Sequence, residues 1–320
     1  MSILERLGVE KPIVQAGMGG GLSRHELAVA VSEAGGLGTI AVTGSATIRD
    51  ELAAARALTD KPIAVNLLLP FARQSWFHAA SRADVVVTFW GVPERRTPGV
   101  WLHQAGSVDE ARAAQAAGAD GVIVQGVEAG GHVRGTTPAL ELLDQVRAAL
   151  PRGFPVLLAG GIATRVDVTR ALEAGAEAAV AGTRFLMSEE SRAHPQYKER
   201  LLTADDTILT DLFGLGWPSA AHRVVPNEAT QQHLGPAGQV PHSHRIVNRW
   251  SAVGVRHVPD AVQARLIARQ HPNSHLLTPQ AATDDRRSSL VQAGPLYAGE
   301  TVERIHDVLP AARIVASLTE

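Results

Sequence analysis

VDEARAAQAAGADGVIVQ, residues 108–125, is typical of a helix that stops at a glycine and passes directly into a short buried strand. Apolar residues recur at helical spacing as far as Ala117, and the run 121–125 is rich in β-branched side chains. The link Gly118–Gly121 has the same form as the link Gly175–Ala178 further along the chain. A helix stop followed at once by a strand indicates a parallel sheet built from alternating strands and helices.

The same alternation extends over the first 186 residues. Ser107 and Thr164 have the character of helix N-caps, and Gly35, Gly118 and Gly175 that of helix C-terminal glycines. The pattern predicts five helices, at 24–34, 48–58, 108–117, 138–150 and 164–174. It predicts eight strands, at 13–17, 37–42, 63–69, 84–90, 100–104, 121–125, 155–159 and 178–182.

Eight strands in this order predict a closed (β/α)8 TIM barrel, with the working residues at the carboxyl ends of the strands. An open, doubly wound sheet is the alternative fold. The segment Pro93–Pro98, between the fourth and fifth strands, is too short for a full helix.

The texture of the sequence changes after residue 187, where Pro, His, Asn and Gln become frequent. We therefore expect about 188–295 to be an insertion between the eighth strand and its helix, mostly helical or irregular, that caps the barrel mouth. The barrel would then comprise residues 1–187 and about 296–320, with 262–270 and the stretch 297–317 helical.

Composition excludes several classes of protein. The formal net charge of −2 argues against a nucleic-acid-binding protein, and the absence of Cys excludes thiolate metal sites and disulfides. No apolar run approaches about 18 residues, and no signal peptide is evident. We expect a cytoplasmic enzyme that has no membrane or nucleic-acid partner; a homodimer stays open.

Glycine-rich turns follow three of the expected strands. They lie at Gln15–Gly21, at Ala159–Ile162 and at Ala181–Phe185. Glycines let a backbone approach a flat ligand or offer N–H groups to an anion, although ordinary tight turns have the same composition. Barrel enzymes often bind phosphate with the last two of these loops, where Thr183 adds a hydroxyl donor. Arg184 is expected to be exposed or salt-bridged.

Polar side chains at two other strand ends are candidates for ligand contacts. Gln125 can donate and accept at a heteroaromatic edge, and Asn66 lies inside an apolar strand, where its amide needs a partner. The loop after Gln125 contains Gly130 and Gly131, a pair that allows a sharp turn to aim His132 into the barrel mouth. His132 would act as a base near neutral pH, whereas Glu128 is expected to be structural.

Seven of the thirteen histidines lie between residues 222 and 275. They show neither an HExxH motif nor paired ligands at the spacing of a zinc site. The sequence therefore predicts a solvated loop region around His242, His244, His271 and His275, and no metal.

Taken together, these loops resemble the nitronate monooxygenase family, also called 2-nitropropane dioxygenase-like proteins. The resemblance rests on Gln15–Met18, Asn66-Leu67, Gln125 through His132, Ala159–Ile162 and Gly182–Phe185, with Asp211–Phe213 and Leu296–Gly299 later in the chain. Flavin-dependent enoyl-acyl-carrier-protein reductases share the fold and a similar loop around the histidine. Some family members carry Lys after the histidine of the fifth strand, where this chain has His103-Gln104.

The resemblance implies a TIM barrel with non-covalent FMN and a smaller substrate domain, at about 188–295, with His132 as the catalytic base. Gly17 and Met18 would contact the isoalloxazine, Asn66 and Gln125 its edge or ribityl chain, and Gly130 would line the flavin. The phosphate would be held by Gly160, Gly161, Gly182 and Thr183.

The expected reaction is oxidation of alkyl nitronates or nitroalkanes by O2 to a carbonyl compound and nitrite. One alternative is an NAD(P)H-dependent FMN reductase acting on enoyl thioesters or quinones. A third hypothesis is a barrel with a binding role and no turnover. The phosphate-type loops favour the two enzyme hypotheses.

Overall fold

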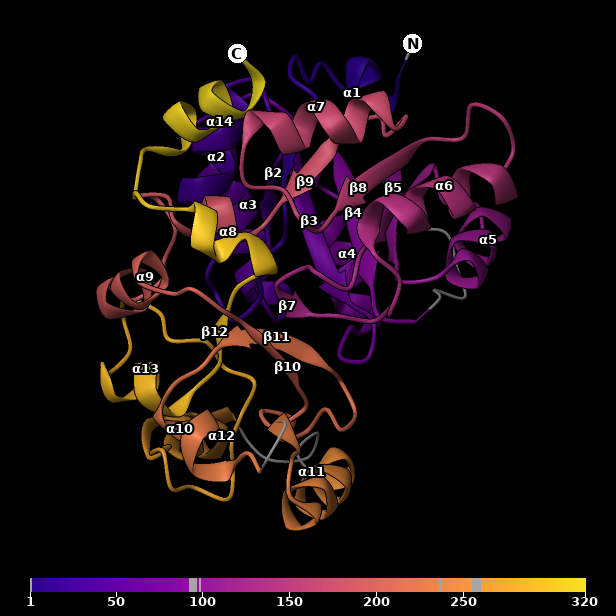
Figure 1. Cartoon of the computed structure of the whole chain (residues 1–320). Coiled ribbons are helices and arrows are strands. Elements are labelled where there is room, and N and C mark those ends of the chain that lie inside the picture. Colours follow the sequence, from indigo (N-terminus) through magenta and orange to yellow (C-terminus); the bar gives the residue numbers. More distant parts are fainter. Residues whose placement is uncertain (1, 92–96, 98, 236–237, 255–259) are drawn as a thin grey trace. The chain divides into compact units, whose positions relative to one another are not determined.

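The computed structural model describes residues 2–91, 97, 99–235, 238–254 and 260–320. It divides into two compact units, shown in Figure 1. The barrel unit comprises residues 1–129, 134–192 and 307–320, and the second unit comprises residues 130–133 and 193–306. The segment Pro93–Pro98 lies, apart from residue 97, outside the described residues.

The barrel unit contains a parallel sheet of eight strands, all within one or two residues of the expected positions. The strands are β1 (Ile13–Gln15), β2 (Gly38–Ile40), β3 (Ile63–Leu68), β4 (Val85–Phe89), β5 (Val100–Ala105), β6 (Gly121–Gln125), β8 (Val156–Ala159) and β9 (Ala179–Ala181). Their order in the sheet is β1-β9-β8-β6-β5-β4-β3-β2. Val14 and Leu37 form a parallel bridge between β1 and the residue before β2, and this bridge joins the two ends of the sheet. The predicted TIM barrel is therefore confirmed, and the open sheet is not.

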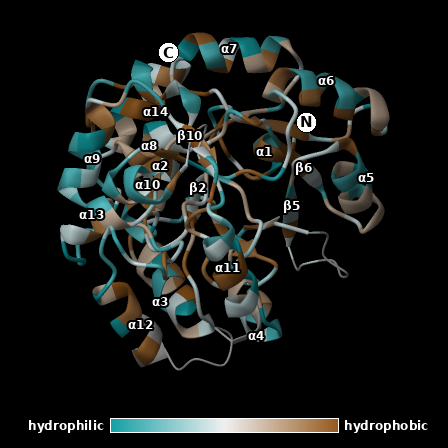
Figure 2. Ribbon diagram, turned by 60° about the horizontal axis from the view of Figure 1, so that its bottom comes forward, coloured by the Kyte–Doolittle hydropathy of each residue, from teal (hydrophilic) through white to brown (hydrophobic). Residues whose placement is uncertain are grey.

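Helices that follow the strands cover the outside of the sheet. They are α2 (His25–Glu33), α3 (Ser45–Arg56), α4 (Gln74–Ala80), α5 (Val108–Ala116), α6 (Ala139–Ala149), α7 (Arg165–Glu173), α8 (Thr183–Leu186) and α14 (Ala311–Thr319). The short helix α1 (Ile3–Arg6) precedes β1 and contributes Ile3 and Leu4 to the cluster inside the barrel. The hydroxyl of Ser107 accepts a hydrogen bond from the N–H of Glu110 at 3.2 Å, as expected of an N-cap. Figure 2 shows hydrophilic and hydrophobic residues alternating along α6 and α7, the pattern of helices with one buried face.

Alternate residues of each strand face two different cores. Ala64, Leu102 and Ile123 belong to the cluster that fills the barrel interior. Trp101 and Val122 belong instead to the cluster between the sheet and the surrounding helices. This two-residue period fixes which side chain at each strand end faces the interior.

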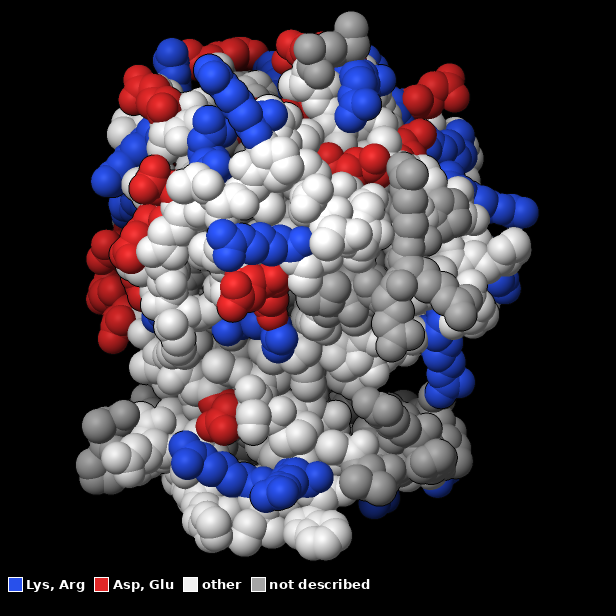
Figure 3. Space-filling view, turned by 90° about the vertical axis from the view of Figure 1, so that its right-hand side faces the viewer, with Lys and Arg blue, Asp and Glu red and all other residues white. Residues whose placement is uncertain are grey.

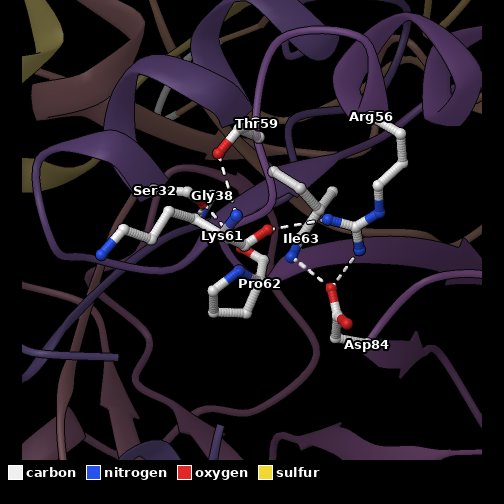
Figure 4. A network of polar contacts seen from close by, with 8 residues as sticks. All are labelled: Ser32, Gly38, Arg56, Thr59, Lys61, Pro62, Ile63 and Asp84. Atoms are coloured by element: carbon white, nitrogen blue, oxygen red, sulfur yellow. Dashed lines mark hydrogen bonds and ion pairs between the residues drawn. The ribbon is translucent and has the colours of Figure 1, made fainter. Parts of the chain in front are cut away.

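The amino ends of β3 and β4 are tied to the neighbouring helices by polar contacts (Figure 4). The Arg56 guanidinium donates to the carbonyl of Lys61 at 2.8 Å and pairs with the Asp84 carboxylate, which also accepts the N–H of Ile63 at 2.8 Å. The Ser32 hydroxyl donates to the carbonyl of Pro62 at 2.7 Å. Because working residues of TIM barrels lie at the opposite, carboxyl ends, we assign this network to stability.

The second unit contains a small antiparallel sheet that the sequence analysis did not predict. Its strands are β7 (Gly131–His132), β10 (Ile208–Thr210), β11 (His222–Val225) and β12 (Leu296–Tyr297), with β11 pairing to each of the other three. Around it lie α9 (Pro195–Leu202), α10 (Glu228–His233), α11 (His242–Gly254), α12 (Asp260–Ala268), α13 (Ser289–Ala293) and the 3₁₀ helix η3 (Glu300–Arg304). The expectation of a mostly helical or irregular domain missed this sheet.

Strand pairing also changes the unit to which two segments belong. Residues 131–132 and 296–297 pair with β11, so both segments belong to the second unit, and the chain returns to the barrel unit at residue 307 rather than about 296. The expected helix over 297–317 is broken into β12, η3 and α14. Tyr297 is in a strand, and Pro310 immediately precedes the only long helix of the stretch.

No helix among the described residues is long and apolar enough to cross a membrane. On the face drawn in Figure 3, Lys and Arg side chains lie among Asp and Glu side chains, as the near-balanced formal charge of −2 leads one to expect.

Candidate functional site

Three amide side chains are placed on the interior face near the carboxyl ends of the barrel strands. Asn66 lies two residues after Ala64 in β3, Gln104 two residues after Leu102 in β5, and Gln125 is the last residue of β6. Their strand positions therefore direct them inward by the two-residue period. An arrangement of neutral donors and acceptors suits a polar heteroaromatic ligand better than an ion.

Asn66 carries a buried acceptor that the described residues leave without a hydrogen bond. Its Oδ1 atom is inaccessible to solvent and has no partner among them. Gly17 backs this side chain closely, because a Cβ atom at residue 17 would lie 2.5 Å from Cβ of Asn66. The glycine expected to contact a ligand thus also has a packing role, since only glycine fits against Asn66.

The turn after β1 is held by Ser23. The Ser23 hydroxyl accepts the N–H of Met18 at 3.0 Å, and the Ser23 N–H donates to the Met18 carbonyl at 3.2 Å. The strand before the turn is fixed by Gln15, whose Oε1 accepts the N–H of Thr39 at 2.8 Å. Met18 is therefore presented by a turn whose polar groups are bonded internally.

The glycine pair after β8 packs around Glu128. Gly160 and Gly161 have φ values of +110° and +75°, a region that side-chain-bearing residues rarely adopt. A Cβ atom at either position would lie 3.5 or 3.6 Å from Cγ of Glu128. The Glu128 carboxylate accepts the N–H of Ala139, the first residue of α6, at 2.9 Å. Glu128 thus stabilises a helix start and joins two loops, in agreement with the structural role expected for it.

The turn after β9 brings Gly182, Thr183 and Arg184 to the carboxyl end of the last strand. A Cβ atom at Gly182 would approach only Ala16, at 3.7 Å, so there is space above this residue. Thr183 is the first residue of α8 and is nearly buried. Arg184 forms a 2.7 Å ion pair with Asp307, as expected of a salt-bridged arginine. The ends of β8 and β9 therefore combine small residues with a hydroxyl donor.

His132 belongs to the second unit. It lies in β7, where it pairs with His222 of β11, and it follows Gly131, whose φ of +76° makes the turn that the two glycines predicted. Gly130 passes against the backbone of Ala298 and Gly299, where a Cβ atom would lie 2.5 Å away. Glycine at 130 is therefore required by close packing within this unit.

An aromatic cage surrounds the imidazole of His132. The indole of Trp217 stacks on it, with ring centroids 4.1 Å apart and an interplanar angle of 25°. The rings of His222 and Tyr297 lie 5.3 and 5.5 Å from it. We call His132, Trp217, His222 and Tyr297 the His132 cage.

Hydrogen bonds fix the tautomer of His222. Its Nδ1 atom lies 2.9 Å from the carbonyl of Ala220, so it donates, and its Nε2 atom accepts the N–H of Phe213 at 3.3 Å. Burial lowers the pKa of His222 to about 4, despite opposing contributions from that carbonyl and from Asp211. His222 is therefore a neutral wall of the cage near pH 7.

Burial is also the main cause that lowers the pKa of His132 well below its usual value near 6.5, and His222 contributes in the same direction. The imidazole is consequently neutral at pH 7, with a lone pair available to take a proton. The cage can thus hold a neutral base in a largely dry environment.

Comparison with known proteins agrees with these features. The sequence model described as "Nitronate monooxygenase" matches residues 2–88 and 79–320. The chain belongs to the nitronate monooxygenase family. It is accordingly an oxidoreductase, as the loop motifs predicted.

Individual relatives of this chain carry names that describe different activities. The chain is 35% identical to a nitronate monooxygenase of Pseudomonas aeruginosa, over 61% of this chain and 71% of the relative. It is 34% identical, over 72% of this chain and 67% of the relative, to a Mycobacterium tuberculosis protein named (3aS,4S,5R,7aS)-5-hydroxy-7a-methyl-1-oxo-octahydro-1H-indene-4-carboxyl-CoA dehydrogenase. A solved structure of nitroalkane oxidase from Streptomyces ansochromogenes matches 99% of this chain and 96% of its own, with a TM-score of 0.75 and 31% identity.

Three members of the His132 cage were not found from the sequence: Trp217, His222 and Tyr297. His222 and Tyr297 come close to His132 through the pairing of β11 with β7 and β12, and Trp217 lies in the loop between β10 and β11. The pair Val224-Val225 is a local signal that could have indicated a strand there.

Proposed function

We propose that the chain oxidises alkyl nitronates, and nitroalkanes that it first deprotonates, using FMN and O2 to give a carbonyl compound and nitrite. The main support for the proposal is the His132 cage, which keeps His132 neutral and desolvated. Membership of the nitronate monooxygenase family supports it as well. A base of this kind suits removal of a proton from carbon next to a nitro group.

The barrel residues fit FMN by the chemistry of their donors and acceptors. The partnerless Oδ1 of Asn66 suits a ring N–H, and the amides of Gln104 and Gln125 add donors and acceptors on the same interior face. Gly160, Gly161, Gly182 and Thr183 would hold the phosphate, and Gly17 and Met18 the flavin ring. When bound, FMN would supply the redox chemistry between substrate and O2.

His132 would accept the α-proton of the nitroalkane on a ring nitrogen and leave a nitronate anion. The protonated imidazole would then lie near that anion and favour it by charge. Trp217 and Tyr297 would exclude water from the base, because their rings enclose it. A substrate that arrives already as a nitronate bypasses the proton transfer.

The test is an aerobic assay of FMN-loaded protein with ethyl nitronate, nitroethane or NAD(P)H plus a quinone. Nitrite release with O2 uptake from the nitro substrates supports the proposal. Rapid oxidation of NAD(P)H without any nitrite from the nitro substrates would contradict it and favour the reductase alternative. The relative that acts on a carboxyl-CoA compound is the reason to include enoyl-CoA in the same panel.

A further inference from the structure

Three histidines of the second unit gather away from the His132 cage. His233 ends α10, His244 lies in α11, and His275 follows α12. Their ring centroids are 4.5 Å apart for His233 and His244, 5.5 Å for His244 and His275, and 6.0 Å for His233 and His275. The sequence analysis expected His244 and His275 to lie in a solvated loop region; the structure instead places them together with His233.

His244 is the unusual member of this group. It is only 3% exposed, and neither of its ring nitrogens has a hydrogen-bond partner among the residues that the structure describes. A neutral imidazole has one N–H donor and one acceptor, so burying both without partners costs free energy. The large majority of buried side-chain polar atoms in proteins are bonded, so a histidine with both nitrogens unpartnered is a candidate for a ligand.

His233 is held in the tautomer that a metal ion needs. Its Nε2 atom lies 2.7 Å from the carbonyl of Pro272, which can only accept, so Nε2 carries the proton. The lone pair of neutral His233 is therefore on Nδ1. A backbone carbonyl that bonds the second nitrogen of a ligating histidine is the usual outer partner in metal sites.

The spacing of the rings matches a three-histidine metal centre. With a metal–nitrogen distance of about 2.1 Å, each ring centroid lies about 3.2 Å from the ion, and tetrahedral geometry separates two centroids by about 5.2 Å. The three measured separations, 4.5, 5.5 and 6.0 Å, bracket this value. Packed rings have similar spacings, so the spacing alone does not decide; the partnerless His244 does.

The rings must turn for their nitrogens to converge. Among the described residues, only His25, Glu26 and Glu51 bring three possible ligand atoms within 4.8 Å of one another. That group is already satisfied, because His25 bonds Glu51 at 2.7 Å and Arg192 pairs with Glu26 at 3.3 Å. His233 is already held by its bond to Pro272, so His244 and His275 would have to turn, and rotation about Cβ–Cγ of a histidine is a soft, roughly two-fold torsion.

We propose that His233, His244 and His275 bind one divalent transition-metal ion, of which Zn²⁺ is the representative, and so join the end of α10, α11 and the segment after α12. Three neutral imidazoles select borderline metals over Mg²⁺ or Ca²⁺. His275 is exposed, which leaves a fourth position for water.

The experiment uses full-length, FMN-loaded protein without a histidine tag, treated with a chelator and dialysed against Zn²⁺. Metal analysis should give one Zn²⁺ per chain, and Zn²⁺ should raise the thermal midpoint. Co²⁺ in its place should give the visible absorption of a tetrahedral site in difference spectra. Mg²⁺ at the same concentration should have no effect on the midpoint.

His275→Gln is the main variant, because an exposed side chain can be replaced without disturbing the fold. It and His244→Gln should weaken Zn²⁺ binding at least about 100-fold. His242→Gln, at an exposed position of the same helix α11, is the matched control and should bind as wild type. Unchanged binding in His275→Gln, an equal loss in His242→Gln, or substoichiometric Zn²⁺ in the wild type would overturn the proposal.

Discussion

The two units position their polar side chains in different ways. In the barrel unit, strand register alone sets the direction of Asn66, Gln104 and Gln125, because each is two residues past an interior residue of a parallel strand. In the second unit, the His132 cage is assembled from short antiparallel pairings between distant segments. The first kind of site can be worked out from sequence periodicity, and the second needs the folded chain.

The largest expected effect separates the base from the cofactor site. His132→Asn should lower turnover of neutral nitroethane by about 10²- to 10⁴-fold, the usual contribution of a general base, because asparagine cannot take the proton. FMN affinity, measured by fluorescence titration, should stay within about twofold, since the proposed phosphate and flavin contacts lie in the barrel unit. Equal turnover of nitroethane by variant and wild type would show that His132 is not the base.

Each unit also contains a buried histidine with a pKa of about 4, so acid should act on both. The Thr88 hydroxyl accepts a hydrogen bond from the indole N–H of Trp101. The same hydroxyl oxygen lies 2.8 Å from Nδ1 of His103, whose side chain is fully buried. Burial, and then Arg134, lower the pKa of His103 to about 4, and burial does the same for His222.

Because these folded-state pKa values lie below the unfolded value near 6.5, the unfolded chain binds more protons between pH 6.5 and 4. The stability contribution is complete above pH 6.5 and is lost as pH falls towards 4, by roughly 3 kcal/mol per histidine. Urea unfolding of His103→Gln and His222→Gln should each show a shallower decline over this range than wild type. Parallel curves for variant and wild type would mean that these histidines do not set the acid sensitivity.

Removing the Trp217 ring from the His132 cage should shift the pH dependence of nitroethane turnover. Neutral His132 is the proposed base, so we expect kcat/KM for nitroethane to fall only when pH drops through its lowered pKa, well below 6.5. Trp217→Ala admits water, which should raise that pKa and move the acidic limb to higher pH. Trp250→Ala, which removes a 75% exposed indole, is the control and should leave the profile in place.

The smallest effect tests the barrel side of the comparison. Asn66→Ala removes one neutral hydrogen-bonding group, so FMN should bind about 3- to 10-fold more weakly. The pH profile for nitroethane at saturating FMN should not move. Gln145→Ala, a change to an exposed amide on α6, is the matched control and should bind FMN as wild type. A loss of affinity in both variants would remove the special role of Asn66.

Much of the barrel could be predicted because its signals are local. Gly118 and Gly175, with φ of +92° and +93°, end their helices where the sequence indicated, and the strands that follow are short and mostly apolar. The residues around His132 could not be predicted in the same way. Trp217 and Tyr297 are 80 residues apart, and no periodicity connects them. The sequence predicts a helix at Tyr297, because no local signal shows that this residue pairs with β11.

The most direct measurement mixes FMN-loaded protein anaerobically with excess ethyl nitronate, NADH or NADPH and follows the absorbance of the flavin. We expect ethyl nitronate to bleach the flavin band or convert it to that of a semiquinone. NADH and NADPH should each leave the band in place. A band bleached by NADH or NADPH and unaffected by nitronate would contradict it, and protein that takes up no FMN would contradict the cofactor assignment as well.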